Sequence, residues 1–382
     1  MSLPPVRRLK VVHVIVAGQI GGAERFLVNL ASRPDASGAD HCLALMTPNP
    51  NLRAFFLDAG VRVCDRGPVQ ENPLAYLWRS FGPSDITWLG RVLQEEKADL
   101  LHAHTFGSHI LAVRSGLRHG LPVIRTEHGV RHYRDPSCAL FRHWALRNTT
   151  RIVAVSSFVA RTIGKIAPDA RSKTTVVLNG IDVARFQPTP PPARGPFTVV
   201  TVCRLEPVKR IALAIEAVAQ VPEVRFDIVG DGVERPKLEG LVRARGIASR
   251  VRFLGHQSDP RPAIAAGHAF INSTREEGLP LAVLEAAAMQ RPAIGFASGG
   301  VPEIVQDGHT GWLAKEDTVA SLAAALKEAA ADPSQVEQFG RNARHLAEAK
   351  FGLDSMCEGY GAVYRDVLQG HSAQAAGIWS TV

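Results

Sequence analysis

The chain has 382 residues, of which 46% are hydrophobic and 21% are charged, and its formal net charge is +8. This length and composition fit a globular protein of two domains, each large enough to bury its own core, and exclude a disordered or fibrous chain. No uncharged apolar stretch reaches the roughly 18 residues of a membrane-spanning helix, and the basic residues form no tract, so no nucleic-acid partner is expected.

The cysteines indicate a reducing compartment. There are five, an odd number, and no two have the spacing of metal ligands. A disulfide scaffold and a zinc ribbon are therefore disfavoured, and a cytoplasmic protein is expected. The basic segment 1–10 precedes a short apolar run, 11–17, that enters a glycine turn, which is typical of a buried strand rather than of a signal peptide.

The first half of the chain alternates short apolar runs with longer amphipathic stretches. Helical spacing of apolar residues is present at 23–32 and 85–97. The alternation predicts a parallel, doubly wound sheet in an N-terminal Rossmann-like domain over residues 1–186. Its strands are expected at 11–17, 41–46, 61–64, 100–104, 123–126, 152–155 and 175–178.

A proline-rich segment divides the chain. Five of the ten residues in 187–196 are proline, which favours a stiff, extended linker. The same pattern then restarts and predicts a second Rossmann-like domain over 197–353, followed by a helix over 354–370 that crosses back to the first domain or packs on the second, and a tail at 371–382. The strands of the second domain are expected at 197–203, 224–229, 251–254, 269–273 and 293–296.

Doubly wound sheets bind ligands where the carboxyl ends of their strands meet, so the loops after the strands are where chemistry is expected. Gly21 and Gly22 lie in the first of these loops, before a helix, where backbone N–H groups can approach a phosphate. Their spacing differs from the dinucleotide fingerprint and from the Walker motif. Taken alone, the two glycines fit a tight turn without a ligand equally well.

The segment 273–286 carries the strongest local signal. Pro280 suits the first turn of a helix, which would place Glu277 in the loop before that helix and Glu285 inside it. A carboxylate accepts two hydrogen bonds and suits the vicinal diol of a ribose or hexose. Glutamates are also favoured near a helix start without any ligand, so for this segment alone a solvated charge pair is the favoured interpretation.

Two other loops favour phosphate binding. Arg204 and Lys209 follow the first strand of the second domain, where fixed cations can hold a diphosphate and offset the charge of a leaving group. The segment 298–303, with sequence SGGVPE, follows another strand and offers glycine amides. Each loop alone is common on protein surfaces, but with the paired glutamates they indicate one shared site.

Histidines end two strands of the first domain. His102 and His104 end one strand, and His128 ends the next. A histidine in such a position can act as a general acid or bind a sugar hydroxyl. His102 and His104 share one face of their strand, but no third ligand has suitable spacing, so no metal site is expected and a structural role for each histidine stays open.

These motifs, in this order, resemble the retaining glycosyltransferases of family 4, which have the GT-B fold. The resemblance runs from about residue 11 to about residue 364. Its most specific part is the run from Glu277 to Glu285, with seven residues between the two glutamates. Supporting parts are the segments 21–24, 102–104, 128–129, 179–182, 230–232 and 299–303, with Ser156, Arg204 and Lys209.

The resemblance implies where the sugar and ribose bind. Glu285 is expected to bind the ribose of a nucleotide-diphosphate sugar, and Glu277 to lie beside the transferred sugar, with Gly278 and Leu279 in the same donor-binding loop. His128 is expected on the sugar face and to be important for transfer.

The resemblance also implies how the diphosphate is held. Arg204 and Lys209 are expected to bind it and to take part in catalysis. The Gly21-Gly22 turn and the backbone amides near Val301 are expected to help.

The implied activity is that of a hexosyltransferase-type glycosyltransferase (EC 2.4) that retains the anomeric configuration and uses no cofactor and no essential metal. Its acceptor would be a sugar or a lipid-linked group in surface polysaccharide or glycolipid assembly. Two alternatives stay open: a nucleotide-sugar epimerase of the same fold, and a catalytically idle scaffold that binds a nucleotide sugar.

The acceptor is expected to contact the first domain around Gly22, 76–81 and 131–134. The stretch 76–81 mixes aromatic residues with arginine, which could bring the protein to an anionic membrane surface at the inner face of the cell membrane. The same mixture is typical of an ordinary helix with one buried face, and this is the favoured interpretation.

Overall fold

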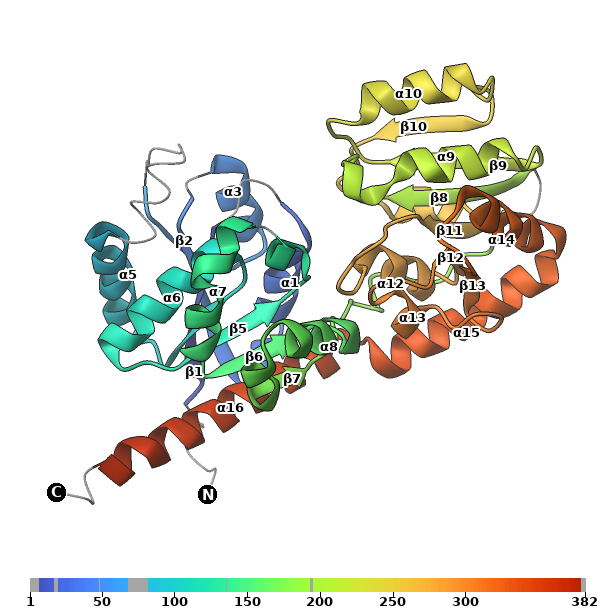
Figure 1. Ribbon diagram of the computed structural model, residues 1–382. Helices are drawn as coiled ribbons and strands as arrows, with labels where there is room; N and C mark the ends of the chain where they lie inside the picture. The colour runs from blue at the N-terminus through green and yellow to red at the C-terminus, as the bar shows by residue number, and fades with distance from the viewer. Residues whose placement is uncertain are drawn as a thin grey trace. The chain divides into compact units, whose positions relative to one another are not determined.

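A computed structural model describes residues 7–16, 20–47, 49–67, 82–134, 136–192 and 195–378 of the chain. The chain forms two compact units (Figure 1). Unit 1 comprises Met1–Gly180 and Leu353–Val382, and unit 2 comprises Ile181–Gly352.

The sheet of unit 1 has seven strands in the order β3-β2-β1-β4-β5-β6-β7, and all neighbours are parallel. Successive strands are added outward from β1 on one side and from β4 on the other. This order confirms the predicted doubly wound sheet. The strands are β1 (Leu9–Ile15), β2 (Ala39–Leu45), β3 (Arg62–Asp65), β4 (Leu100–Ala103), β5 (Val123–Glu127), β6 (Arg151–Ala154) and β7 (Thr174–Val176).

Helices cover both faces of this sheet because alternate strand residues point to opposite sides. Val12 and Val14 pack with α5 and α6, whereas Val11 and Leu100 pack on the other side with α1 and α16 (Figure 1). The helices are α1 (Gly22–Ala31), α2 (Pro34–Ser37), α3 (Pro50–Asp58), α5 (Pro83–Glu95), α6 (Phe106–His119), α7 (Pro136–Arg147), α8 (Ser157–Ile166) and α16 (Leu353–Ile378), with short 3-10 turns η1 (Arg131–Arg134) and η2 (Pro168–Lys173).

The last helix, α16, belongs to unit 1 although all of unit 2 precedes it in the chain. Met356, Tyr360 and Tyr364 are spaced four residues apart and pack into the core of unit 1. The helix continues to Ile378, so it includes both the helix expected at 354–370 and part of the tail expected at 371–382. Within the described ranges, no helix is both long and apolar enough to cross a bilayer.

The sheet of unit 2 has six parallel strands in the order β10-β9-β8-β11-β12-β13. It is again doubly wound, and the order reverses between β8 and β11. The first five strands lie where the sequence predicts them, and β13 is an addition to the prediction. The strands are β8 (Phe197–Val202), β9 (Val224–Val229), β10 (Val251–Gly255), β11 (Ala269–Asn272), β12 (Ala293–Phe296) and β13 (Gly311–Ala314).

The core of unit 2 contains Phe226, Ile228 and Trp312 from the sheet, packed against apolar residues of α9, α10, α14 and α15. The helices are α9 (Ile211–Ala219), α10 (Arg235–Ala244), α11 (Arg261–Ala266), α12 (Leu281–Ala288), α13 (Val301–Ile304), α14 (Val319–Ala331) and α15 (Pro333–Lys350), with the 3-10 turn η3 (Pro207–Lys209).

The proline-rich segment 187–196 is fixed to unit 2 in its described part. The buried Arg291 side chain donates to the Thr189 carbonyl oxygen at 3.0 Å and to the Thr189 hydroxyl at 2.9 Å. His268 Nε2 lies 3.2 Å from the Pro192 carbonyl oxygen. The two units divide at Gly180 and Gly352, outside this segment.

Glycines let the strand-end loops of unit 2 touch each other. A Cβ built on Gly230 would lie 1.8 Å from the Cys203 carbonyl oxygen, and one on Gly300 would lie 1.9 Å from the Gly278 carbonyl oxygen. The Gly300 amide donates to the Glu277 carbonyl oxygen at 2.9 Å. Backbone therefore packs on backbone between the loop after β11 and the loop after β12, and the position of Glu277 depends on both.

We expect the Gly300→Ala substitution to lower the free energy of unfolding by about 1–3 kcal/mol, because the added methyl group overpacks this contact. The measurement is the urea unfolding of the purified variant. Gly240→Ala in α10 is the control, since its Cβ would meet no atom nearer than 3.9 Å, and it should stabilise the helix by about 0.5–1 kcal/mol. Equal destabilisation by both variants would contradict the loop contact.

Candidate functional site

The reversal of strand order in unit 2 places a pocket at the carboxyl ends of β8 and β11. Such reversals are where doubly wound sheets bind their ligands. The pocket is lined by residues of both strands and of the loops after them, including Thr201, Cys203, Lys209, Asn272, Glu277 and Pro280.

Lys209 and Glu277 form an ion pair at this pocket. Lys209 Nζ lies 2.6 Å from Glu277 Oε1, and the two side chains keep 20% and 26% of their surface exposed. The Ser273 hydroxyl donates to the Lys209 carbonyl oxygen at 2.7 Å, which ties the loop after β8 to the loop after β11. Two of the predicted site residues are therefore in direct contact although 68 positions separate them.

The helix α12 begins as the sequence predicts. Pro280 is its N-cap, Glu277 lies in the loop before it, and Glu285 lies within it. Leu279 and Gly278 are buried in that loop, and Glu285 is 9% exposed. A carboxylate so little exposed needs hydrogen-bond partners, which the protein or a ligand hydroxyl supplies.

Two predicted amide donors are already engaged inside the protein. Val301 starts α13, and its amide donates to the Ser298 carbonyl oxygen at 3.2 Å. The Gly21 amide donates to Glu24 Oε2 at 2.8 Å, in a capping box at the start of α1. A phosphate oxygen would have to displace these acceptors in order to bind either amide.

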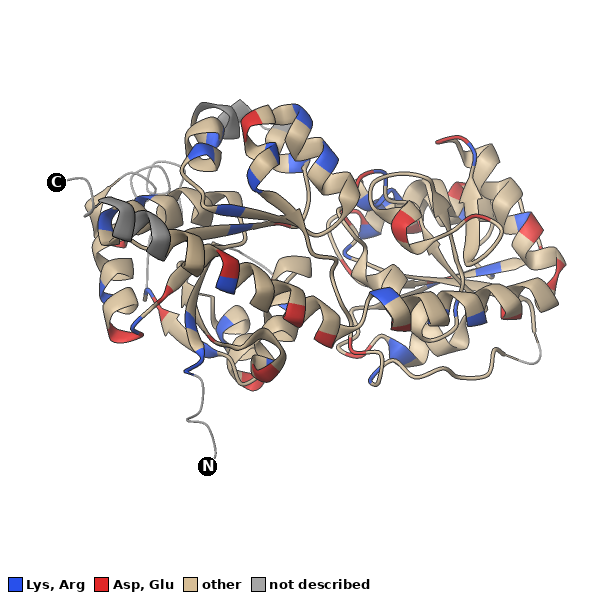
Figure 2. Ribbon diagram, turned by 90° about the horizontal axis from the view of Figure 1, so that it is seen from below, with Lys and Arg blue, Asp and Glu red and all other residues tan. Residues whose placement is uncertain are grey.

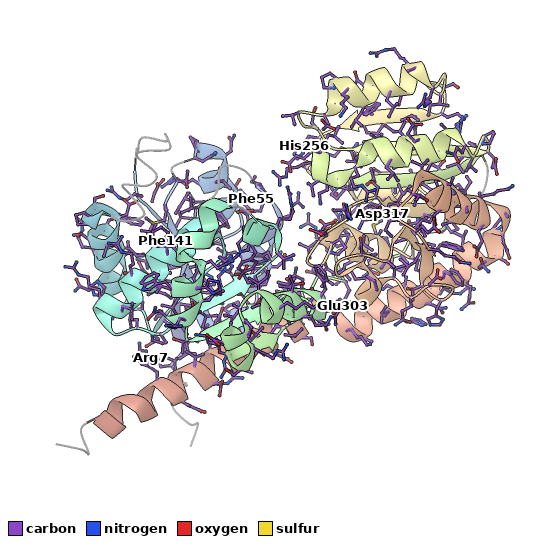
Figure 3. All side chains as sticks on the ribbon, in the orientation of Figure 1. Arg7, Phe55, Phe141, His256, Glu303 and Asp317 are labelled. Carbon is purple, nitrogen blue, oxygen red and sulfur yellow. The ribbon has the colours of Figure 1, made fainter. Side chains whose placement is uncertain are left out.

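Three other basic residues in the loops of unit 2 have acidic neighbours. Arg204 Nη1 lies 2.7 Å from Glu206 Oε1, and about half of the Arg204 side chain is exposed. Asp317, labelled in Figure 3, accepts from Arg210 at 2.5 Å and lies 3.4 Å from Arg275 Nε. The loops around the pocket thus carry basic residues whose charge is partly compensated.

The structure adds Asn272 to the candidate site. Its side-chain oxygen accepts from the Thr274 amide at 3.1 Å, whereas its buried Nδ2 has no partner in the described part of the chain. A buried donor without a partner in a pocket wall suits a ligand oxygen. Burial also raises the pKa of the neighbouring Cys203 thiol to about 11, so this thiol stays protonated at neutral pH.

His128 lies in unit 1, beside α1. Its ring packs against Phe26 of α1, with 4.9 Å between ring centroids. Burial, and secondarily the charge of Arg125, lower the pKa of His128 to about 3, although Glu127 acts in the opposite direction. At neutral pH the ring is therefore uncharged, and it can exchange a hydrogen bond with a hydroxyl but cannot act as a cationic acid.

Gly22 is the first residue of α1, and a Cβ built on it would meet no atom of the described residues within 4 Å. The described part of the chain therefore leaves room beside this glycine, whereas the amide of Gly21 is engaged.

A buried ion pair stands directly before His128. Arg125 Nε and Nη2 donate to the two carboxylate oxygens of Glu127 at 2.9 and 3.0 Å, and the Tyr133 hydroxyl donates to Glu127 at 2.7 Å. Burial raises the pKa of Glu127, but the charge of Arg125 and these hydrogen bonds outweigh it and hold the pKa at about 2. Tyr133 lies in the region 131–134 that is predicted to touch the acceptor, and its hydroxyl instead contacts Glu127. The other region predicted to touch the acceptor, 76–81, lies outside the described residues.

The structure brings His13 next to the predicted pair His102 and His104. One nitrogen of each ring could in principle hold a metal ion. His102, however, hydrogen-bonds to the Tyr364 hydroxyl at 2.9 Å and to Thr126 at 2.7 Å, and both nitrogens of His13 and of His104 bond to other histidines. A metal ion would have to break these bonds, so the rings fit a hydrogen-bonded network better than a metal site.

A second group, Cys42, Cys64 and Glu96, also comes together. The two sulfur atoms lie 3.5 Å apart on the neighbouring strands β2 and β3. The spacing of Cys42 and Cys64 in the sequence does not predict this pair, because parallel pairing of β2 with β3 brings the two residues together. Elsewhere, Lys and Arg are distributed over both units among Asp and Glu (Figure 2), as the scattered charge in the sequence predicts.

Comparison with known families identifies the chain. The model of "Glycosyl transferases group 1" matches residues 184–346, and that of "Glycosyltransferase Family 4" matches residues 20–185. The chain belongs to glycosyltransferase family 4, group 1. The predicted family is thereby confirmed, together with the GT-B fold and the class of activity, that of a hexosyltransferase-type glycosyltransferase (EC 2.4).

Individual relatives of this family 4 glycosyltransferase match either most of its length or one half of it. The glycogen synthase of Mycobacterium tuberculosis is 26% identical and covers 92% of each chain. The lipopolysaccharide core biosynthesis glycosyltransferase LpsE of Rhizobium meliloti is 31% identical over 44% of this chain and 49% of its own. The Anabaena protein HepE, solved with UDP and glucose, has a TM-score of 0.83 at 19% identity, over 94% of this chain and 100% of that one.

We expect Glu127→Gln to lower the free energy of unfolding at pH 7 by about 3–5 kcal/mol, because it leaves the buried Arg125 charge uncompensated. The pKa of Glu127 is depressed from 4.5 in the reference state to about 2, so its contribution is complete above pH 4.5 and disappears as the pH falls toward 2. The difference between wild type and variant should therefore shrink over that range in chemical denaturation experiments.

The double variant Arg125→Met with Glu127→Gln is the control for this prediction. It removes both charges and should recover part of the lost stability. If the double variant lost more unfolding free energy than the two single variants lose together, the ion pair would not be the source of the effect.

Proposed function

We propose that this protein is a retaining glycosyltransferase that moves a sugar from a nucleotide-diphosphate sugar to an acceptor hydroxyl. The observation that carries the proposal is the Lys209–Glu277 ion pair, 2.6 Å long, at the point where the strand order of unit 2 reverses. A cation and a carboxylate held side by side suit a ligand that is anionic at one end and rich in hydroxyl groups at the other.

The donor binds to unit 2 in this proposal. Lys209 and Arg204 bind the diphosphate, and the Asn272 amide donates to a ligand oxygen. Glu285 accepts from the ribose hydroxyls, and Glu277 accepts from a hydroxyl of the transferred sugar, in the loop that Gly278 and Leu279 form. The structures of HepE with UDP support this class of donor.

The transfer step needs little covalent chemistry from the protein. The bond between the anomeric carbon and the diphosphate oxygen breaks, the acceptor oxygen bonds to that carbon on the same face, and the departing phosphate takes the acceptor proton. Lys209 and Arg204 stabilise the charge that develops on the leaving group, which is the largest single contribution that such a site can make. His128, uncharged at neutral pH, offers a hydrogen bond to a sugar hydroxyl.

We propose that this step uses no cofactor and no essential metal, since Lys209 and Arg204 supply positive charge at the leaving group. The acceptor is a sugar or a lipid-linked group, and the pathway is surface polysaccharide or glycolipid assembly on the cytoplasmic side, with peripheral contact to an anionic membrane. The relationship to LpsE of Rhizobium meliloti supports this pathway.

The first test of this function is calorimetric binding of UDP, GDP and ADP. We expect one nucleotide to bind, and Glu285→Gln to weaken its affinity by about tenfold or more, because a charge-assisted hydrogen bond contributes about 1.5–3 kcal/mol. The affinity should be unchanged in Glu328→Gln, a control on the exposed side of α14 in the same unit. No binding of any nucleotide by the folded protein would overturn the proposal.

The stereochemistry of transfer is the second test. With the α-linked nucleotide sugar that binds, NMR of the product should show an α-glycoside, formed at an equal rate in the presence of EDTA. Lys209→Met should lower kcat by about a hundredfold, as the loss of a leading electrostatic donor does. A β-glycoside would contradict retention, loss of activity with EDTA would contradict transfer without a metal, and an isomerised donor without a glycoside would indicate an epimerase.

A further inference from the structure

Four histidines of unit 1 form one continuous hydrogen-bonded chain. His41 Nδ1 lies 2.8 Å from His13 Nε2, His13 Nδ1 lies 2.8 Å from His104 Nε2, and His104 Nδ1 lies 3.2 Å from His128 Nε2. Each link joins Nδ1 of one ring to Nε2 of the next. We call these four residues the histidine chain.

Strand register explains why the rings meet. His13 is level with His102 across β1 and β4, and Val11 is level with His41 across β1 and β2. One face of the sheet is covered by α1 and α16. This face carries the odd-numbered residues of β1 and β2 and the even-numbered residues of β4 and β5. The histidine chain therefore crosses four neighbouring strands on one face of the sheet, with its two inner rings buried and its two end rings partly exposed.

All four rings are uncharged at neutral pH. Burial lowers the pKa of His13 and His104 well below 6.5, that of His41 to about 4 and that of His128 to about 3. A neutral imidazole has one nitrogen that donates and one that accepts. If one ring donates through Nδ1, the next ring must accept at Nε2 and therefore also donates through Nδ1.

The histidine chain consequently has two states, each with one tautomer throughout. In one state every Nδ1 carries the proton, and in the other every Nε2 does. The far end at His41 Nε2 meets the Ser37 hydroxyl at 3.0 Å, and a hydroxyl can either donate or accept. Among the described residues, the hydrogen bonds of the His128 ring involve Nε2, so its Nδ1 is the end that can meet a ligand.

We propose that His104, His13 and His41 are positioning residues that set the tautomer of His128, and hence whether its Nδ1 offers a sugar hydroxyl a proton or a lone pair. This role rests on the proposed function, which places a sugar beside His128. The proton on His128 changes nitrogen only when protons shift along every link, so the buried strands control a group at the site. The ring of His128 is also held in one orientation by the last link.

His102 provides a matched control. It is as deeply buried as His13, its ring lies 4.9 Å from that of His13 and 4.2 Å from that of His104, and its pKa is lowered in the same way. Its two nitrogens, however, bond to Tyr364 and Thr126 and to none of the histidine chain. Replacing His102 disturbs the same core without breaking a link.

The test compares His13→Phe with His102→Phe, both of which keep a ring of similar size. NMR of the protein labelled with 15N at histidine reports the tautomer of each ring without any substrate. We expect one common tautomer at His41, His13, His104 and His128 in the wild type. His13→Phe should change the balance of tautomers at His128, and His102→Phe should leave it unchanged.

The kinetic readout is separate from the spectroscopic one. We expect His13→Phe to lower kcat by at least about tenfold, as a wrongly protonated catalytic histidine does, with the KM of the donor unchanged, and His102→Phe to keep the wild-type kcat. His41→Phe, at the partly exposed end of the histidine chain, serves if His13→Phe does not fold.

The outcomes test the coupling of the tautomers separately from the role of His128 in the proposed function. The coupling between the rings would be overturned if the four rings of the wild type had different tautomers. It would also be overturned if His13→Phe and His102→Phe changed the tautomer of His128 equally. A changed tautomer with unchanged kcat would overturn the positioning role. Full activity in His128→Phe would instead refute the role of His128 in the proposed function and leave the coupling, which NMR measures, intact.

Discussion

Parallel pairing of the strands is the constraint on which the candidate residues of both units depend. It sends the carboxyl ends of all strands in a sheet to one edge, so loops far apart in sequence meet there. In unit 2 this edge joins Lys209 to Glu277, and glycine contacts such as Gly300 on Gly278 fix the loops at backbone distance. In unit 1 it brings His104 and His128 together from the ends of β4 and β5.

The candidate residues of the two units differ in their electrostatics. The pocket of unit 2 keeps charged groups partly exposed, as a site for an anionic ligand must, because a fully buried charge is costly. In unit 1, His104 is buried and His128 is partly buried, and both rings are uncharged at neutral pH, so they interact by a hydrogen bond rather than by charge. Unit 2 thus holds its charged groups by charge compensation, whereas unit 1 fixes the direction of its hydrogen bonds.

Much of this site could be predicted from the sequence because its signals are local. Pro280 at a helix start placed Glu277 in the loop and Glu285 in α12, and the structure agrees. The amides were harder to predict. Those of Gly21 and Val301 follow a phosphate-binding pattern, but the Glu24 carboxylate and the Ser298 carbonyl accept from them. Which acceptor reaches an amide depends on side-chain conformation in the first case and on the backbone turn in the second.

The sequence by itself determined the family, the doubly wound sheets and the loops that carry chemistry, since hydrophobic period and turn residues are written in consecutive positions. Only the tertiary structure decided which side chains meet. Asn272 is a candidate because its buried side-chain Nδ2 has no partner in the described part of the chain. Strand register brings His13 and His41 into one hydrogen-bonded chain with His104 and His128. Strand order and register are set by packing across the whole sheet, and no single segment of sequence encodes them.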